Sequence, residues 1–498
     1  MASQLVEHFA RVSRDTPDRT VLIGLSEERT LTAAELQAEY EAVRGGLVRA
    51  GFGDESLIVS VAGNRAGYFS LLLACLDLGV ALMPVDRSTP LAEIIALVDR
   101  WHASGLVMLD PPKLDRPHLT VPLPNDPYLA VFRGITPEPT LYAGSAVLKL
   151  TSGSSGLPKA TRTTEHHMAE DVSHIVEAMD IRPTDVQLGA IPLSHAYGLG
   201  NLVLPLLVQG TAVVLRDGFA PSELPADARE HNVRVFPGVP FMFEHLLQHV
   251  APEAWPPSLQ LLITAGARIE FETVRGFDAK FGRKIHSFYG TSETGGICYD
   301  DSIAVGDRVT VGRPMPGVGI TFRRSFNADG DSDIPADLPP GVGRIHVKGS
   351  AVAVSYAGLP ASEQEGFVDN GFLTGDLGFA NDRGEVMLTG RVSSFINVAG
   401  RKVQPDEVER VLRDMPDIAD VKIIGVPDPQ RGEMLAACIV RRDPRLRPLD
   451  VRQYCAMRLA AHKVPRVYVF LDEMPRDERG KTSRRALDEA VARELADL

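Results

Sequence analysis

The sequence predicts an α/β fold with mixed α+β parts: a large N-terminal body of layered sheets and helices, then a small C-terminal α/β domain. Short apolar runs alternate with helical segments up to about residue 300, and strands that alternate with helices pair in parallel. Clusters of Gly, Pro and Asp separate short alternating runs between residues 306 and 400, which predicts a β-rich subdomain. The alternation resumes after residue 403. We therefore expect two domains, residues 1–390 and 391–498.

Apolar spacing and capping residues predict the first helices. Leu5 and Phe9 share one face of an N-terminal helix. Thr32 and Glu35 have the spacing of a capping box, so a second helix is expected from residue 32 to about residue 50. A helix at 70–78 should end at Gly79, because glycine is the usual residue just after a helix C-terminus.

Continuous apolar runs predict the strands of the N-terminal body. Strands are expected at 56–61, 80–85, 187–192, 212–215, 233–236 and 261–264. The alternating run at 344–348 predicts an antiparallel strand. The C-terminal tail is expected to be βαβ-like, with helices at 405–412 and 449–460 and strands at 421–426 and 435–440.

Composition excludes several classes of protein. The chain has 498 residues, 44% of them hydrophobic, and a formal net charge of −13, which excludes a disordered chain and the basic stripe of a nucleic-acid-binding protein. The four cysteines form no C-x-x-C pair, so neither a disulfide framework nor a zinc ribbon is expected, and a reducing cytoplasmic location fits. We expect no membrane span, because no run of about 18 apolar residues occurs.

A loop of Gly, Ser and Thr follows an apolar strand that ends at Thr151. Its sequence is Ser152-Gly153-Ser154-Ser155-Gly156-Leu157-Pro158-Lys159. Backbone N–H groups and hydroxyls of such a loop can bind an anion, and Lys159 adds a positive charge. A solvated linker is the alternative, but a linker would not follow an apolar strand in mid-domain. Pro158 stands where a Walker A motif requires glycine, so the loop predicts nucleotide binding outside the P-loop NTPases.

Three later segments also suit nucleotide chemistry. The segment Tyr289-Gly290-Thr291-Ser292-Glu293 combines an aromatic ring, hydroxyls and a carboxylate that could bind Mg²⁺, although Glu293 could instead begin a helix. Asp376 lies in a tight turn and could accept hydrogen bonds from ribose hydroxyls, or could simply stabilise the turn. The basic segment 479–485 would, taken alone, be a solvated tail.

In this order, the segments resemble the adenylate-forming superfamily, which includes acyl-CoA synthetases, aryl-CoA ligases, peptide-synthetase adenylation domains and luciferases. The resemblance covers nearly the whole chain. The stretches that carry it are Thr151 to Lys159, Tyr289 to Glu293, Thr374-Gly375-Asp376, Gly390-Arg391 with the following Ile396, Gly400 and Glu407 to Glu409, and Gly480-Lys481.

The resemblance implies that a carboxylate attacks the α-phosphorus of Mg·ATP, releases pyrophosphate and forms an acyl adenylate, which CoA then attacks. It implies that Lys481, on a mobile C-terminal domain, bridges the carboxylate and the phosphate, and that Glu293 holds Mg²⁺. The implied ATP- and AMP-binding residues are Thr151, Ser152, Gly153, Ser154, Ser155, Gly156, Lys159, Gly266, Ala267, Tyr289, Gly290, Thr291, Ser292, Asp376 and Arg391.

The same resemblance implies an acyl pocket and a thiol tunnel. His195 matches a position beside the acyl carboxylate, although a core histidine with satisfied hydrogen bonds is the alternative. Tyr197, Phe236 and Gly238 would line the pocket, and Gly400 the tunnel. No acidic residue lies between residues 191 and 200, so an amino-acid substrate is not expected, while fatty and aryl acids both remain open.

Two positions depart from the family pattern. Ser393 stands where relatives carry Asp or Lys at the hinge, and Arg344 stands where many carry glutamate. The leading hypothesis is an acid–CoA ligase. The alternatives are an acyl-AMP ligase that loads an acyl carrier protein, for which Arg401 and Lys402 would suit an acidic partner, and a catalytically inactive protein that binds ATP or an acyl ligand.

Overall fold

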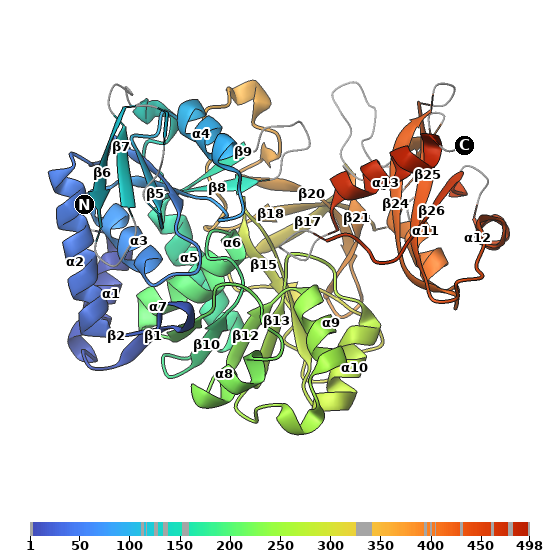
Figure 1. Cartoon of the computed structure of the whole chain (residues 1–498), viewed down its shortest axis with the longest axis horizontal. Coiled ribbons are helices and arrows are strands. Elements are labelled where there is room, and N and C mark those ends of the chain that lie inside the picture. Colours follow the sequence, from blue (N-terminus) through green and yellow to red (C-terminus); the bar gives the residue numbers. More distant parts are fainter. Residues whose placement is uncertain are drawn as a thin grey trace. The chain divides into compact units, whose positions relative to one another are not determined.

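The computed structural model describes residues 3–110, 114–115, 117–123, 128–132, 138–151, 159–324, 341–392, 396–398, 401–403, 405–428, 432–459, 463–476 and 482–496. The chain divides into two compact units (Figure 1). Unit 1 comprises Met1–Ile320, His346–Leu373 and Asp382–Val386, and unit 2 comprises Thr321–Ile345, Thr374–Asn381 and Met387–Leu498. Unit 2 thus combines the C-terminal residues with two earlier segments, so it does not correspond to a single cut in the chain. The domain boundary at residue 390 stays a prediction.

A seven-stranded sheet forms part of unit 1, with strand order β6-β7-β5-β3-β4-β8-β9 among the described residues. Its strands are β3 (Leu57–Val61), β4 (Ala81–Pro84), β5 (Gly105–Met108), β6 (His118–Pro122), β7 (Tyr128–Phe132), β8 (Val147–Thr151) and β9 (Lys159–Thr163). Strands β3, β4, β5 and β8 are parallel, as the alternation with helices predicts. The helices near it are α2 (Ala33–Arg49), α3 (Gly67–Leu78) and α4 (Leu91–Arg100).

A nine-stranded sheet forms the rest of the body of unit 1, with order β16-β15-β14-β13-β12-β10-β11-β1-β2 in the described chain. Its strands are β1 (Thr20–Gly24), β2 (Arg29–Thr32), β10 (Val186–Gly189), β11 (Ala212–Leu215), β12 (Val235–Gly238), β13 (Leu261–Thr264), β14 (Ile285–Thr291), β15 (Gly295–Tyr299) and β16 (Arg313–Pro314). Its helices are α1 (Gln4–Asp15), α5 (Glu165–Met179), α6 (Ala196–Gly198), α7 (Leu204–Gln209), α8 (Leu224–Glu230), α9 (Pro240–His249) and α10 (Phe271–Phe281).

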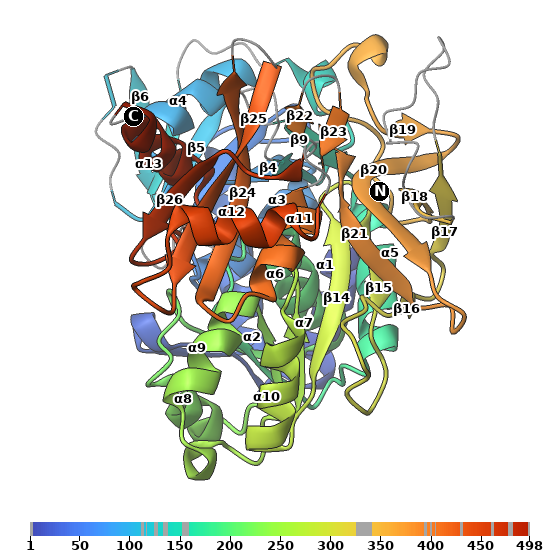
Figure 2. The ribbon, with the colours of Figure 1, turned by 90° about the vertical axis from the view of Figure 1, so that its right-hand side faces the viewer.

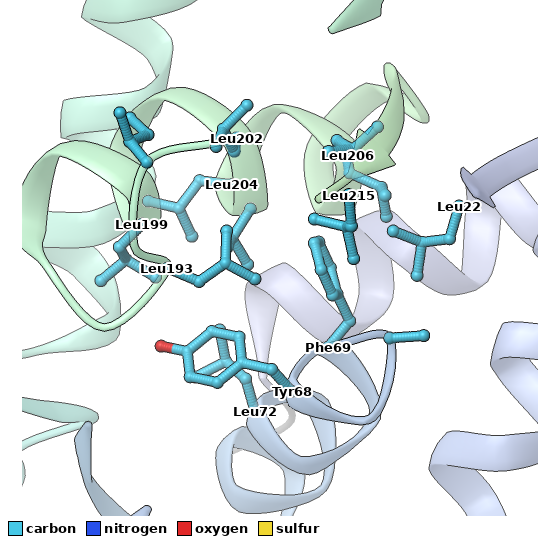
Figure 3. Close-up of a cluster of buried hydrophobic side chains, with 14 of the residues drawn as sticks. Leu22, Tyr68, Phe69, Leu72, Leu193, Leu199, Leu202, Leu204, Leu206 and Leu215 are labelled. Atoms are coloured by element: carbon cyan, nitrogen blue, oxygen red, sulfur yellow. The ribbon is translucent and has the colours of Figure 1, made fainter. Parts of the chain in front are cut away.

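One hydrophobic core joins the two sheets of unit 1. Helix α3 is buried along almost its whole length, because it packs against strands of both sheets. Figure 3 shows Phe69 of α3 beside Leu215 of β11 and Leu22 of β1. The expected capping box of Thr32 and Glu35 begins α2, and Gly79 ends α3 in the left-handed conformation with φ +70°, as predicted.

A five-stranded sheet has the order β17-β18-β20-β19, with β21 beside β20, among the residues described. Its strands are β17 (Gly319–Arg323), β18 (Gly343–Lys348), β19 (Phe367–Val368), β20 (Gly371–Ala380) and β21 (Val386–Arg391). The expected strand at 344–348 is therefore present. The division between the two units runs through β17, β18, β20 and β21.

The C-terminal part of unit 2 is an α/β layer (Figure 2). Its elements are β22 (Ile396–Val398), β23 (Arg401–Val403), α11 (Pro405–Arg413), β24 (Ile418–Asp428), β25 (Gly432–Arg441), α12 (Pro448–Ala456), β26 (Val467–Leu471) and α13 (Arg484–Ala496). Alternate residues of β24 face opposite sides: Ile423 packs with α11 and α12, and Ile424 packs with α13.

The expected βαβ arrangement of the C-terminal part is present as β25-α12-β26, in which β25 and β26 are parallel. Strands β24 and β25 form an antiparallel pair. Of the basic segment 479–485, Arg484 and Arg485 begin helix α13, and their side chains are 59% and 91% exposed. No helix in the described ranges has the length and apolarity to cross a membrane.

Candidate active site

The candidate phosphate loop connects two paired strands of unit 1. Thr151, the last residue of β8, is paired in register with Lys159, the first residue of β9. The Thr151 hydroxyl also donates a hydrogen bond to the Lys159 carbonyl, with 3.3 Å between the oxygens. Both ends of the loop are thus fixed by the sheet. The candidate ligands Ser152, Gly153, Ser154, Ser155 and Gly156 lie outside the described residues.

Lys159 lies at the downstream end of this loop, with 23% of its side chain exposed. Its ammonium group forms an ion pair with Glu365 at 3.2 Å and lies 5.0 Å from the ring centre of Tyr356. Because Glu365 is 83% exposed, this ion pair is weak, and a phosphate could replace the carboxylate at little cost.

The second candidate nucleotide segment forms the turn between β14 and β15. Tyr289 is buried, with 8% of its surface exposed, and is paired with Cys298 of β15. A Cβ at Gly290 would lie 2.5 Å from the Gly295 carbonyl oxygen, so this close strand approach requires glycine. Thr291 is hydrogen-bonded to Thr294 across the turn.

Glu293 lies in this turn and does not begin a helix, so that alternative for Glu293 is wrong. The residue is 8% exposed, and its Oε1 accepts a hydrogen bond from the Tyr356 hydroxyl at 2.8 Å. Burial, followed by the nearby Glu293 charge, raises the pKa of Tyr356, so this hydroxyl is a donor at neutral pH.

The residues around Glu293 fit a magnesium ion held largely by nucleotide. No group of three His, Cys, Asp or Glu side chains that could hold a metal ion occurs in the part of the chain that the structure describes. Mg²⁺ in nucleotide enzymes is commonly bound by one or two carboxylates together with substrate phosphates and water. The single carboxylate of Glu293 can therefore be the protein's ligand in such a site, and carboxylate oxygens are the ligands that Mg²⁺ prefers.

A buried lysine lies behind the two candidate segments. Lys149 of β8 is 6% exposed, and burial lowers its pKa, while the charges of Asp171 and Glu293 oppose that shift. Asp171 is also buried and accepts a hydrogen bond from the Gly296 backbone at 2.8 Å. Lysine in a strand usually indicates a solvent-facing position, so sequence alone gave no reason to select Lys149.

Thr161 links the two candidate segments. Its hydroxyl oxygen lies 3.2 Å from the Lys149 carbonyl oxygen and 3.4 Å from the Ser292 carbonyl oxygen. Thr161 also forms a backbone bridge with Tyr356. The strands that carry the phosphate loop and the turn that carries Ser292 and Glu293 therefore lie side by side within unit 1.

In unit 2, Asp376 and Arg391 form an ion pair with 2.9 Å between Oδ1 and Nε. The Asp376 carboxylate is 14% exposed, whereas the Arg391 side chain is 62% exposed. The Thr374 hydroxyl accepts a hydrogen bond from the Asp376 backbone at 3.1 Å. Arg344 donates to the Thr374 carbonyl at 3.1 Å, which gives this departure from the family pattern a structural role in supporting the turn.

His195 lies after β10 at the start of α6, with 33% of its side chain exposed. Its Nε2 is 3.2 Å from Oδ2 of Asp86, which follows β4. The pKa of Asp86 is lowered mainly by the hydrogen bond from His195, and to a smaller extent by hydrogen bonds from the Ser88 side chain and backbone. This exposure does not support the alternative of a core histidine, and the distant partner Asp86 was not identified from the sequence.

The candidate acyl-pocket residues differ in exposure. Tyr197 donates a hydrogen bond to the Ile263 carbonyl at 3.0 Å and lies 5.8 Å from the ring of Phe288. Phe236 is fully buried, and Gly238 beside it is also buried. The ATP-binding candidates Gly266, with φ +83°, and Ala267 are exposed just after β13. The catalytic candidate Lys481, the tunnel candidate Gly400 and the hinge residue Ser393 lie outside the described residues.

Two family models match the chain. The chain matches the family model of the AMP-binding enzyme over residues 9–357 and that of the AMP-binding enzyme C-terminal domain over residues 407–481. It is 28% identical to a sulfoacetate–CoA ligase of Cupriavidus necator, with 94% of each protein covered.

Two further proteins are similar over nearly their whole length. A fatty acid–[acyl-carrier-protein] ligase, ScoC, of Streptomyces coeruleorubidus is 28% identical, covering 93% of this chain and 92% of that protein. The structure of an ATP-bound RpMatB-BxBclM chimera superposes with a TM-score of 0.84 at 25% identity, covering 98% of this chain and 99% of the other. The chain therefore belongs to the AMP-binding enzymes of the adenylate-forming superfamily and is an acid–thiol ligase of the acyl-CoA synthetase type.

Proposed function

We propose that the chain activates a fatty or aryl carboxylic acid with Mg·ATP and transfers the acyl group to the thiol of CoA. The observation that carries this proposal is the junction at Thr161, where the phosphate-loop strands and the Ser292–Glu293 turn meet. The phosphate loop and Lys159 would bind phosphates through backbone amides, hydroxyls and an ammonium group. The turn would bind a metal ion through the Glu293 carboxylate.

In the first half-reaction a carboxylate oxygen attacks the α-phosphorus, and the bond from that phosphorus to pyrophosphate breaks. An anion attacks a polyanion, so catalysis consists mainly of charge neutralisation and alignment. Thr151 and Lys159 would bind the leaving pyrophosphate, Ser292 the α-phosphate, and Lys481 would bridge the two reactants. Mg²⁺ held by Glu293 and the nucleotide would neutralise part of the phosphate charge when bound.

Asp376 would accept hydrogen bonds from the ribose hydroxyls, and its ion pair with Arg391 supports this role by fixing the direction of the carboxylate. Tyr289, Gly266 and Ala267 would surround the adenine. In the second half-reaction the acceptor thiol, as thiolate, attacks the acyl carbonyl carbon and expels AMP. Gly400 would line the approach of that thiol.

The acid would lie near His195, whose bond to Asp86 fixes the orientation of the imidazole ring. Tyr197 would form part of the apolar wall. A carrier-protein thiol is a second candidate acceptor, because the fatty acid–[acyl-carrier-protein] ligase ScoC matches the chain over nearly its whole length.

The proposal is tested by measuring pyrophosphate release with a panel of fatty, aryl and dicarboxylic acids, each with CoA, with a holo acyl carrier protein, or with neither. We expect release that depends on the acid, followed by a CoA thioester. Thioester formation on the carrier alone would establish the second acceptor. Pyrophosphate release that is independent of every acid would contradict the proposal.

A further inference from the structure

Tyr356 contacts both of the charged side chains that the proposed function assigns to the phosphate end of ATP. Its hydroxyl donates to Oε1 of Glu293 at 2.8 Å. The face of its ring lies 5.0 Å from the ammonium nitrogen of Lys159. Tyr356 and Glu293 are 6% and 8% exposed, so the hydrogen bond between them is made in a largely water-free environment, where it is stronger than at the surface.

The backbone and ring of Tyr356 are held firmly by their own neighbours. The Tyr356 backbone N–H donates to Oε1 of Gln364 at 2.7 Å, and Nε2 of Gln364 donates to the Tyr356 carbonyl at 2.9 Å. The ring packs edge-on against Phe367, with 5.2 Å between ring centres. Because Tyr356 also bridges to Thr161 of β9, its position is tied to the strand that begins at Lys159.

The hydrogen bond leaves the two oxygens of Glu293 unequal. Oε1 is occupied by the Tyr356 hydroxyl, whereas no described group donates a hydrogen bond to Oε2. A carboxylate constrained through one oxygen keeps a fixed direction for the other, and a ligand held in place loses less conformational entropy when it binds an ion. The ring of Tyr356 constrains Lys159 in the same way.

We infer that Tyr356 is a positioning residue: its hydroxyl orients Glu293 toward the metal ion of Mg·ATP, and its ring holds Lys159 toward the phosphates. This inference rests on the proposed function. The two roles are separable, because phenylalanine keeps the ring and loses only the hydroxyl, whereas leucine loses both.

The test measures ATP binding by calorimetry, once with Mg²⁺ and once with EDTA, for the unaltered enzyme, Tyr356→Phe and Tyr356→Leu. For Tyr356→Phe we expect about tenfold weaker Mg·ATP binding and unchanged metal-free ATP binding, as for one lost hydrogen bond to a charged group. Tyr356→Leu should weaken both. Tyr142→Phe is the matched control, because this buried tyrosine also donates one hydrogen bond, to the Glu55 carbonyl, and should bind like the unaltered enzyme.

Two results for Tyr356→Phe would overturn the inference: binding of Mg·ATP equal to that of the unaltered enzyme, or equal losses with and without the metal, which would indicate a general structural role. Failure of the proposed function looks different. In that case the unaltered enzyme itself would gain no ATP affinity from Mg²⁺ and would release no pyrophosphate in response to an acid, and the inference would fall with it.

Discussion

Replacing Asp376 by alanine should weaken ATP binding about 100-fold and barely change the stability of the fold. The carboxylate is 14% exposed, and the proposed site gives it two ribose hydroxyls as donors. Hydrogen bonds to a charged group contribute about 1.5–3 kcal/mol each, so the loss of two costs at least about 3 kcal/mol, or roughly 100-fold.

The cost in stability should be much smaller. Arg391 is 62% exposed, and ion pairs of that exposure contribute about 0–1 kcal/mol. The turn itself keeps the bond from the Asp376 backbone to the Thr374 hydroxyl, which does not depend on the side chain. Thermal unfolding of Asp376→Ala should therefore resemble that of the unaltered enzyme.

The assay is acid-dependent ATP–pyrophosphate exchange with ATP, 2′-deoxy-ATP and 3′-deoxy-ATP. The unaltered enzyme should prefer ATP to both deoxy analogues. Asp376→Ala should lose most of that preference, because the carboxylate that accepts hydrogen bonds from the ribose hydroxyls is absent. Asp443→Ala is the control, since Asp443 forms an ion pair with Arg445 in the same unit at 2.9 Å. An unchanged KM for ATP, or an undiminished preference over the deoxy analogues, would refute the assignment.

Three further predictions concern other parts of the chain. Lys481→Ala should abolish pyrophosphate exchange but leave thioester formation from supplied acyl adenylate; equal loss of both half-reactions would refute its role. Glu409→Ala should lower the free energy of unfolding by about 1–3 kcal/mol in urea titrations, because it removes the buried Glu409 carboxylate that accepts from the Ile423 backbone N–H at 3.0 Å; a change below about 0.5 kcal/mol would contradict this. The hydrogen bond with His195 lowers the pKa of Asp86 in the folded protein. The ionised Asp86 carboxylate therefore stabilises the fold above about pH 4, and this stabilisation is lost as the pH falls toward the lowered pKa of Asp86. The stability difference between the unaltered enzyme and Asp86→Asn should therefore shrink below about pH 4; a constant difference would be inconsistent with the pair.

Features set by neighbouring residues could be predicted from the sequence. The capping box at Thr32 and the left-handed Gly79 depend on residues within one helical turn, and both are present. The loop of Gly, Ser and Thr was predicted from composition to follow a strand, and the residues at its two ends are paired strand residues. The direction of β24 relative to β25 depends on the loop between them, which the apolar runs do not specify.

Features that depend on distant partners were not predictable. His195 and Asp86 are separated by 109 residues, and Tyr356 and Glu293 by 63 residues, so no local pattern connects them. The role of Arg344 became clear only with its bond to the Thr374 carbonyl. In each case the candidate residue was recognisable from the sequence, but the distant residue bonded to it was not, because that residue resembles an ordinary member of its strand or loop.

The burial of the cysteines has a practical consequence for measuring this enzyme. Cys75, Cys298, Cys438 and Cys455 are all free and fully buried. Burial raises the pKa of every one of these thiols, to about 12 for Cys438 and about 11 for Cys455. At pH 8 at most about one in a thousand of them is the reactive thiolate. A disulfide reagent added to the native enzyme should therefore titrate only CoA, so the turnover of the acceptor can be followed continuously without a background from the protein.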